Sequence, residues 1–572
     1  MAEITTGTNS ETLIGMIKEE LKEYLSEAIQ QAIHSGALAP FDYGDLNIEV
    51  PRDASNGDFS TNAAMLLAKS AKTAPQRIAQ NIVDYFPQDT KLVQSVEIAG
   101  PGFINFYLKD GWLQDSLYKL LRQGDRFGRS NQGKKKKVQI EFVSANPTGE
   151  LHIGNARGAA IGDTLASLMS LCGYDVKREF YINDAGNQIE KFGVSLECRY
   201  LQELGEDVPF PEDGYVGQDI ILTMRQLIEE QGDKYKDMEP TLRRELLTQY
   251  ALEKKISTIR KALCDFGVEY DVWFSEQSLH DGGAVADVIE SLKEKNYLLE
   301  EDDALWLDCR LFGEAKPEVL VRANGVPTYY AADIAYHDNK FKRGFDQVID
   351  IWGADHHGHV ARMIGAMEAL GYERGRLQVI LMQFVRLYQD GELLKMSKRT
   401  GTYVTLEELV EEVGRDAARF FFVMRSSDSL IDFDLDLAKS QSAENPVYYV
   451  QYAHARICSI LSAAKEQGYN LADLADDKIR LALLTDESEE ALIRKMLDYP
   501  DEVIYAAVHR EPHRIAAYIQ DLAGAFHHFY NNCRVLGEEE PLSLARCALI
   551  LGVKTIIKSA LNAMGVQAPE KM

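Results

Sequence analysis

The sequence has little of what marks secreted, membrane-embedded or metal-stabilised proteins. Its seven cysteines include no C-x-x-C pair, which argues for a reducing compartment and against a structural zinc site. No apolar run reaches the roughly 18 residues that a membrane span needs. The N-terminal residues lack both the apolar stretch of a secretory signal and the arginine-rich character of a transit peptide. We therefore expect a cytoplasmic protein with no membrane partner and no metal ligands of its own.

Positive charge is also scarce, because 62 lysines and arginines stand against 89 aspartates and glutamates, a formal net charge of −27. This balance excludes a protein that coats nucleic acid indiscriminately, although local basic patches could still meet a specific RNA. We find no internal repeat and no low-complexity tract. With 45% hydrophobic residues, the 572-residue chain can bury a large core, divided among roughly three or four domains.

The order of strand and helix signals predicts three domains. Residues 1–125 mix amphipathic helices with strands around a Gly-Pro-Gly turn, as in a small α+β domain. Residues 126–436 alternate strands and helices, which is typical of an α/β fold with a Rossmann-type parallel sheet, interrupted by a polar helical insertion at about 190–290. Residues 437–572 carry helical periodicity without strand signals and predict an all-α bundle.

The first strong motif is the stretch SANPTGELHIGNARG at residues 144–158. A β-branched and aromatic run ends at a proline turn, and helical periodicity begins at about His152. The free N–H groups of such a helix start favour phosphate. His152 can donate to a phosphate oxygen and Gly154 permits close approach of a nucleotide. A lone histidine at such a turn is, however, more often a structural residue.

The second motif, KMSKR at residues 395–399, places three cations and the hydroxyl of Ser397 close together. Lys395 and Lys398 could meet the charge that develops as pyrophosphate leaves. An isolated cluster of this kind is usually a solvated surface. Its position beyond the last predicted strand of the same sheet favours a place opposite His152, where such sheets bind ligands.

Together these motifs resemble the HIGH and KMSKS signatures of the class I aminoacyl-tRNA synthetases. Other stretches resemble the arginyl-tRNA synthetases in that family's order and from end to end of the chain: REFYINDAGNQI, VLVRANGVPTYYAADIAYH, DIWGADHHGH, FDLDLA and NPVYYVQYAHAR. The chain departs from the family in two places. Asn155 replaces the second histidine of the first signature, and DAAR at residues 416–419 replaces DALR.

The resemblance implies ATP-dependent activation of L-arginine to arginyl-adenylate, followed by transfer to the 3′-terminal adenosine of tRNA(Arg). It implies a monomer that uses ATP together with Mg²⁺. Its catalytic residues would be His152, Asn155, Lys395 and Lys398, and the same four with Gly154 and Ser397 would bind ATP.

A guanidinium group requires paired anions in a planar arrangement. Tyr329 and Asp333 lie four residues apart and share a face of a predicted helix. From spacing alone, an exposed helical carboxylate is the commoner interpretation. The resemblance adds further arginine-binding residues: Glu276 opposite this face, Glu141 and Asn146 for the α-amino end, and Asp355 beside the amino acid or nucleotide.

Both ends of the chain are expected to bind the tRNA. Tyr448, Tyr449, Tyr452 and Arg456 interleave rings and charge in a way that suits stacking on anticodon bases, although the same spacing fits helix packing. We expect some of these tyrosines inside and others on the surface. For residues 1–125 the resemblance implies contact with the tRNA elbow, with Asn56 and Phe59 as candidates.

Two alternatives remain at this stage. Asn155 and the acidic charge also fit a catalytically impaired tRNA-binding paralogue, which would tolerate loss of Lys398. A small-molecule nucleotidyltransferase can share the strand–turn–helix motif, but it needs no aromatic C-terminal bundle.

Overall fold

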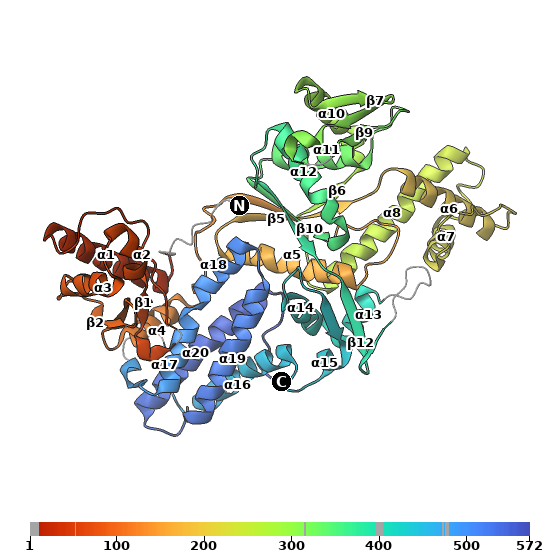
Figure 1. Cartoon of the computed structure of the whole chain (residues 1–572). Helices are drawn as coiled ribbons and strands as arrows, with labels where there is room; N and C mark the ends of the chain where they lie inside the picture. The colour runs from red at the N-terminus through yellow and green to blue at the C-terminus, as the bar shows by residue number, and fades with distance from the viewer. Residues whose placement is uncertain (1–10, 52, 314–315, 395–403, 472–473, 475–479) are drawn as a thin grey trace.

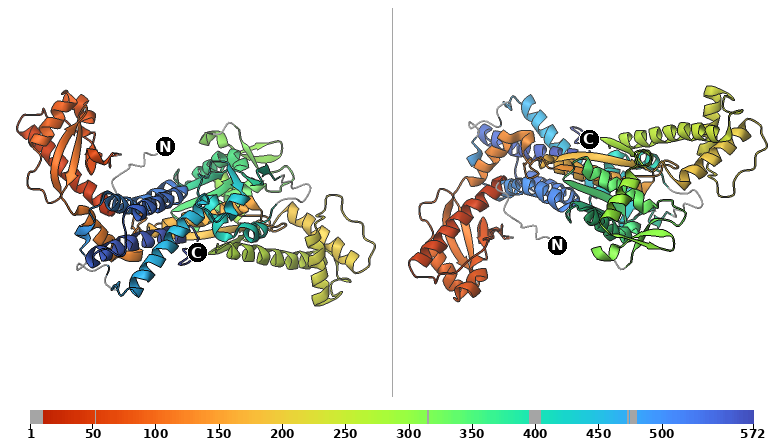
Figure 2. Two further views of the ribbon diagram at one scale, coloured as in Figure 1. Left: turned by 90° about the horizontal axis from the view of Figure 1, so that it is seen from below. Right: turned by 90° about the horizontal axis from the view of Figure 1, so that it is seen from above.

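The computed structural model describes residues 11–51, 53–313, 316–394, 404–471, 474 and 480–572. An N-terminal α+β unit and a helical insertion lie at opposite ends of the molecule, with a parallel sheet between them (Figures 1 and 2). The C-terminal helices pack beside that sheet (Figure 1). This arrangement confirms the predicted α/β fold with an α+β unit before it and an all-α bundle after it. Within the described ranges, no helix is both long and apolar enough to cross a membrane.

The N-terminal unit is an antiparallel sheet of order β1-β3-β2 covered by helices. Its elements are α1 (Leu13–His34), β1 (Phe59–Thr61), α2 (Ala63–Ala71), α3 (Pro75–Asp84), β2 (Val93–Ala99), β3 (Phe103–Leu108) and α4 (Trp112–Gln123). Gly102 has φ +131° in the β2–β3 turn, and a Cβ there would lie 3.0 Å from the Pro75 side chain. Glycine is therefore required where this turn meets α3.

The central sheet has five parallel strands in the order β11-β10-β4-β5-β6. They are β4 (Lys137–Glu141), β5 (Asp175–Ile182), β6 (Val272–Ser275), β10 (Gln347–Gly353) and β11 (Leu377–Met382). Helix α5 (Ile153–Leu171) covers one face so closely that a Cβ on Gly162 would lie 2.3 Å from the Phe142 ring. Helix α11 (Tyr329–Lys342) covers the other face, where Lys340 contacts Glu141. Parallel strands buried on both faces place a ligand site at their carboxyl ends.

Two smaller modules interrupt the sheet. Helices α6 (Asn187–Glu203), α7 (Gln218–Gln231) and α8 (Pro240–Asp265) form the protruding insertion with a core of its own. Buried Glu197 receives Arg243 and Arg244 at 2.8 Å and ties α6 to α8. After β6 come α9 (Gln277–Asp281), α10 (Ala284–Glu294) and an antiparallel sheet of β7 (Leu298–Glu301), β8 (Ala304–Leu307) and β9 (Glu318–Val321), and α12 (His357–Leu370) follows β10.

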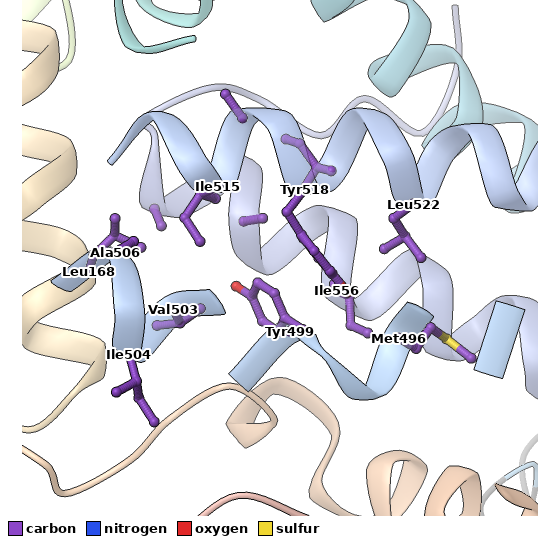
Figure 3. Close-up of a cluster of buried hydrophobic side chains, with 14 of the residues drawn as sticks. Leu168, Met496, Tyr499, Val503, Ile504, Ala506, Ile515, Tyr518, Leu522 and Ile556 are labelled. Atoms are coloured by element: carbon purple, nitrogen blue, oxygen red, sulfur yellow. The ribbon is translucent and has the colours of Figure 1, made fainter. Parts of the chain in front are cut away.

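Beyond the sheet, a short module leads into the C-terminal bundle. It contains β12 (Val385–Gln389), β13 (Glu392–Leu393), α13 (Leu406–Val413), α14 (Arg415–Val423), β14 (Ile431–Asp434) and α15 (Leu435–Lys439). The bundle contains α16 (Pro446–Glu466), α17 (Glu487–Leu497), α18 (Tyr499–His509), α19 (His513–Asn532) and α20 (Glu540–Ala563). Figure 3 shows Val503 and Ala506 of α18 beside Leu168 of α5, so the bundle packs directly on the helix that starts at His152.

Arg419, on α14, joins four parts of the chain and is fully buried. Its guanidinium donates to Asp163 Oδ2 on α5 at 2.5 Å and to the carbonyl of Met564, after α20, at 2.7 Å. It also donates to the carbonyls of Phe266 and Gly267, which follow α8, at 3.2 and 3.3 Å. The last residue of the DAAR sequence thus connects the sheet domain, the insertion and the bundle.

We predict that Arg419→Met destabilises the protein by about 3–5 kcal/mol. The substitution leaves three buried carbonyl groups and one oxygen of the Asp163 carboxylate without their hydrogen-bond donor. Thermal unfolding should show a lower midpoint, and limited proteolysis should separate the bundle from the rest. Arg386→Met is the matched control, since Arg386 pairs with Asp432 at 2.6 Å on the surface, where such pairs contribute little. Equal midpoints for the two variants would contradict the role given to Arg419.

Candidate active site

The start of α5 explains why asparagine can stand in the fourth position of HIGN. His152 is the N-cap residue, and its Nδ1 accepts from the Gly154 N–H at 3.0 Å. Asn155 Oδ1 accepts from the His152 N–H at 3.0 Å, which completes a reciprocal capping box. The amide oxygen of Asn155 is therefore structural, while its NH₂ group carries two donor hydrogens.

The loop after β4 is strained, with φ +75° at Val143 and +37° at Ser144. Positive φ is costly for a β-branched residue and clusters at functional sites. Ser144 holds the loop in place: its hydroxyl donates to Glu141 Oε1 at 2.7 Å and accepts from the Tyr181 N–H at 3.2 Å. Glu141 is only 7% exposed and its other oxygen contacts Lys340, so its carboxylate is engaged inside the protein.

Acidic side chains gather at the carboxyl ends of β5 and β6, and this cluster is named the acidic pocket. Glu276 is 4% exposed and is hydrogen-bonded to the Tyr181 hydroxyl. Tyr181 packs against Phe274 and Tyr336, with ring centroids 6.3 and 4.4 Å away. Asp333, on the first turns of α11, is close enough for its charge to act on both Glu276 and Tyr181.

The electrostatics of this pocket favour a cation. Burial raises the pKa of Glu276 to about 7; the Tyr181 hydrogen bond opposes the rise, and the charges of Asp333 and Asp184 add to it. The pKa of Tyr181 rises as well, mainly through burial and then through Glu276 and Asp333. Without a positive partner, these carboxylates cannot all be ionised at neutral pH without cost. A ligand with a delocalised positive charge relieves that conflict.

The remaining predicted arginine-binding residues, Tyr329, Asp355 and Asn146, are exposed. His359 Nε2 contacts Asp333 Oδ2 at 3.1 Å, which fixes one oxygen of that carboxylate. Tyr329 is 53% exposed, beside Gly186 at the rim. Asp355 follows β10, and its side chain is 64% exposed. Asn146, also exposed, donates to Gln188 Oε1 at 2.8 Å.

Lys395, Ser397 and Lys398 fall within residues 395–403, outside the described residues. The chain on either side of them is described. Thr405 forms an antiparallel bridge with His152, and the Leu406 N–H donates to the Leu151 carbonyl at 2.9 Å. The chain that follows the KMSKR motif therefore returns directly to the start of α5.

The three tyrosines of α16 differ in exposure, because Tyr452 is exposed whereas Tyr448 and Tyr449 are half-buried. Tyr452, 36% exposed, has its ring 6.3 Å from that of Tyr448 at an interplanar angle of 13°. The Arg456 guanidinium lies 5.7 Å from the Tyr452 centroid. Tyr449 is half-buried against His527, with the centroids 4.9 Å apart. The exposed aromatic and basic groups therefore come from Tyr452 and Arg456, and Tyr448 is half-buried beside Tyr452.

The two predicted tRNA-binding residues of the N-terminal unit, Asn56 and Phe59, also differ in exposure. Asn56 is exposed, whereas Phe59 is 1% exposed and lies in the core, with its ring 6.1 Å from that of Trp112. This burial argues against direct contact of Phe59 with a base. Tyr181 and His359 also belong to the acidic pocket, although no sequence pattern predicts them there. Aromatic residues in a strand normally indicate packing, so nothing in the sequence distinguishes Tyr181 from its neighbours.

Family models match most of the chain in three consecutive parts. Residues 116–442 match the class I (R) tRNA synthetase catalytic domain, residues 19–108 the arginyl tRNA synthetase N-terminal domain, and residues 450–572 the DALR anticodon-binding domain. The parallel sheet with a site at the start of α5 is thus that of a class I aminoacyl-tRNA synthetase.

Curated relatives narrow this class. An arginine–tRNA ligase of Moorella thermoacetica is 56% identical over 97% of this chain and 99% of its own length. One of Desulforamulus reducens is 55% identical over 98% of this chain and 100% of its own length. The chain belongs to the arginyl-tRNA synthetases, enzymes that use ATP to activate arginine and charge tRNA with it. Nothing in these comparisons supports an impaired paralogue.

Solved structures share the fold. Thermus thermophilus arginyl-tRNA synthetase has a TM-score of 0.71 and 22% identity over 96% of this chain and all of its own. The Plasmodium falciparum arginyl-tRNA synthetase has a TM-score of 0.73 and 20% identity over 97% of this chain and 99% of its own. A Mycobacterium tuberculosis methionyl-tRNA synthetase reaches 0.52 at 12% identity, over 75% of this chain and 91% of its own. At these identities the likeness concerns the fold alone.

The capping box allows the roles of the Asn155 amide oxygen and NH₂ group to be tested separately. Asn155→Asp keeps an oxygen for the cap but removes the NH₂ donors, whereas Asn155→Ala removes both. If the NH₂ group donates to ATP, both variants should lose about 1–3 kcal/mol of transition-state stabilisation in adenylate formation, while Asn155→His stays within about tenfold of wild type.

The thermal midpoint provides the control, because only Asn155→Ala should lower it, by the loss of a cap interaction of about 1 kcal/mol. Full activity of Asn155→Asp together with low activity of Asn155→Ala would assign the residue to capping alone. Full activity of both would exclude contact with ATP.

Proposed function

We propose that the pocket of Glu276, Asp333 and Tyr181 binds the guanidinium group of arginine. The observation that carries this assignment is a buried carboxylate whose pKa is raised to about 7 beside a second carboxylate. A planar cation can accept both groups through its fork of donors. His359 fixes the orientation of Asp333, and Tyr329 closes the rim of the pocket.

The other end of arginine extends toward the start of α5. We assign its α-amino group to the neighbourhood of Asn146 and Asp355, with Glu141 supporting the strained loop from beneath. The arginine carboxylate then lies near the α-phosphate of ATP. Its oxygen attacks the α-phosphorus, the mixed anhydride forms, and pyrophosphate leaves.

For ATP we assign His152, Gly154 and the Asn155 NH₂ group to nucleotide binding at the N-terminus of α5. Lys395, Ser397 and Lys398 stabilise the leaving pyrophosphate by charge and position. Mg²⁺ enters with ATP as part of the substrate and leaves with pyrophosphate. No proton transfer is required of the protein in this step, because the attacking carboxylate is already ionised.

The tRNA assignments follow the three-domain division. We propose that residues 437–572 bind the anticodon, with Tyr448, Tyr452 and Arg456 on the contact surface and Tyr449 supporting them from inside. Residues 1–125 bind the tRNA elbow around Asn56, and residues 126–436, with the insertion at about 190–290, perform the chemistry. We infer that the enzyme acts as a monomer in the cytoplasm, where charged tRNA(Arg) is consumed.

The raised pKa of Glu276 predicts a pH-dependent arginine KM. Arginine binding favours the ionised carboxylate, so below about pH 7 it must displace a proton. The arginine KM should therefore rise by up to about tenfold for each pH unit below 7 and level off above about pH 8. Arginine-dependent ATP–pyrophosphate exchange with tRNA(Arg) present measures it, and the ATP KM serves as reference.

Glu276→Gln should weaken arginine and abolish this pH dependence, because glutamine cannot ionise. Glu290→Gln, on the exposed side of α10, is the matched control and should behave as wild type. An arginine KM that remains flat from pH 6 to 8 in the wild-type enzyme would move the guanidinium site away from Glu276.

A further inference from the structure

Beneath the acidic pocket, three carboxylates form a row across the parallel sheet. Asp350 of β10 is the Cα partner of Glu141 of β4, and Glu141 is the partner of Glu179 of β5. Their exposed fractions are 0%, 7% and 0%. Adjacent partners in a parallel sheet point to the same face, so these three acids face α11 together. Buried carboxylates in such a row require cations.

Helix α11 and the residue after it supply two obvious cations. Lys340 is 0% exposed and contacts Glu141 Oε2 at 2.5 Å and Asp350 Oδ1 at 2.8 Å. Arg343 donates to both oxygens of Glu179, at 2.6 and 2.8 Å. Two cations thus meet three carboxylates, and burial raises the pKa of Glu141 although the charge of Lys340 opposes the rise.

His337 has partners that decide its protonation state. Its Nε2 lies 2.7 Å from Asp350 Oδ2, and its Nδ1 lies 2.7 Å from the backbone carbonyl oxygen of Asp333. A carbonyl oxygen and an ionised carboxylate can only accept hydrogen bonds. A neutral imidazole has a single N–H and would turn a lone pair toward one of these two acceptors.

The surroundings of His337 are consistent with a positive charge. Burial would raise the pKa of Asp350, but Lys340 and His337 outweigh it and hold that pKa at about 2, so the carboxylate is ionised. The rings of Tyr336 and Trp352 lie steeply inclined to the imidazole, with centroids 5.5 and 6.2 Å away. Lys340 pairs with one oxygen of Asp350, and an imidazolium at His337 pairs with the other.

We propose that His337 is a buried imidazolium that positions Asp333 for arginine recognition. One N–H binds the carbonyl of Asp333, the other binds β10 through Asp350, and the ring so fixes the first turns of α11 against the sheet. Asp333 then presents its carboxylate to the pocket beside Glu276. The inference rests on the proposed contact between Asp333 and the guanidinium group.

The protonation state is tested directly by ¹⁵N NMR of enzyme labelled at the histidine ring nitrogens. The signal that disappears in His337→Gln should be that of a doubly protonated ring at about pH 7.5, where an ordinary histidine is largely neutral. A signal that shows one unprotonated nitrogen would overturn the charge assignment.

The positioning role is tested by kinetics of the same variant. Glutamine retains one donor group but cannot bridge both acceptors, so the arginine KM should rise about tenfold while kcat and the ATP KM change less than about twofold. His34→Gln is the matched control, since His34 is exposed at the end of α1. An unchanged arginine KM, or an equal loss in all three constants, would overturn the role.

Two further variants make the outcomes separable. His337→Gln combined with Asp350→Asn removes both charges and should show the same rise in arginine KM, and it replaces the single variant if that fails to fold. Asp333→Asn tests the guanidinium contact itself. A raised arginine KM in Asp333→Asn without one in His337→Gln overturns this inference, whereas an unchanged KM in Asp333→Asn overturns the proposed function instead.

Discussion

The ion pair between Arg419 and Asp163 is the constraint on which the relative placement of the domains depends. Asp163 lies in the middle of α5 and also receives Arg178 of β5 at 2.8 Å. Through Arg419 the same carboxylate reaches the end of α8 and the carbonyl after α20. A desolvated guanidinium that satisfies four acceptors permits one geometry only, because any displacement leaves a buried polar group unpaired.

Helix α5 connects this ion pair to the active site. The helix that carries Asp163 in its middle begins at the His152 capping box, and its side faces the bundle at Leu168. A second buried cation, Arg157, donates to the carbonyls of Gln383 and Ser426 at 2.7 and 2.8 Å. Helix α5 is therefore also fixed to the connection between β11 and β12 and to the chain that follows α14.

The sequence was sufficient where the determinants are local. The strand, proline turn and helix at residues 138–171 follow from periodicity and turn residues, and the three-part fold follows from their alternation along the chain. The sequence was insufficient where the role of a side chain depends on contacts with residues that are distant in the chain. Tyr181 becomes a pocket residue only because β5 lies beside β6, and Glu141 is occupied only because Lys340, 199 residues later, lies beneath it. Phe59 likewise lies in the core against Trp112, which pattern alone cannot pair with it.

The junction at the end of α20 has a consequence for how such enzymes can be recombined. Gly565 has φ +65°, and a Cβ there would lie 2.4 Å from the Arg419 guanidinium carbon. The last turn of the bundle is thus shaped by a residue of another domain. A chimera that exchanges the bundle as a module must carry α14 with it, or match its arginine to the incoming helix end. Lineages that trade anticodon domains are therefore expected to trade this interface as a unit.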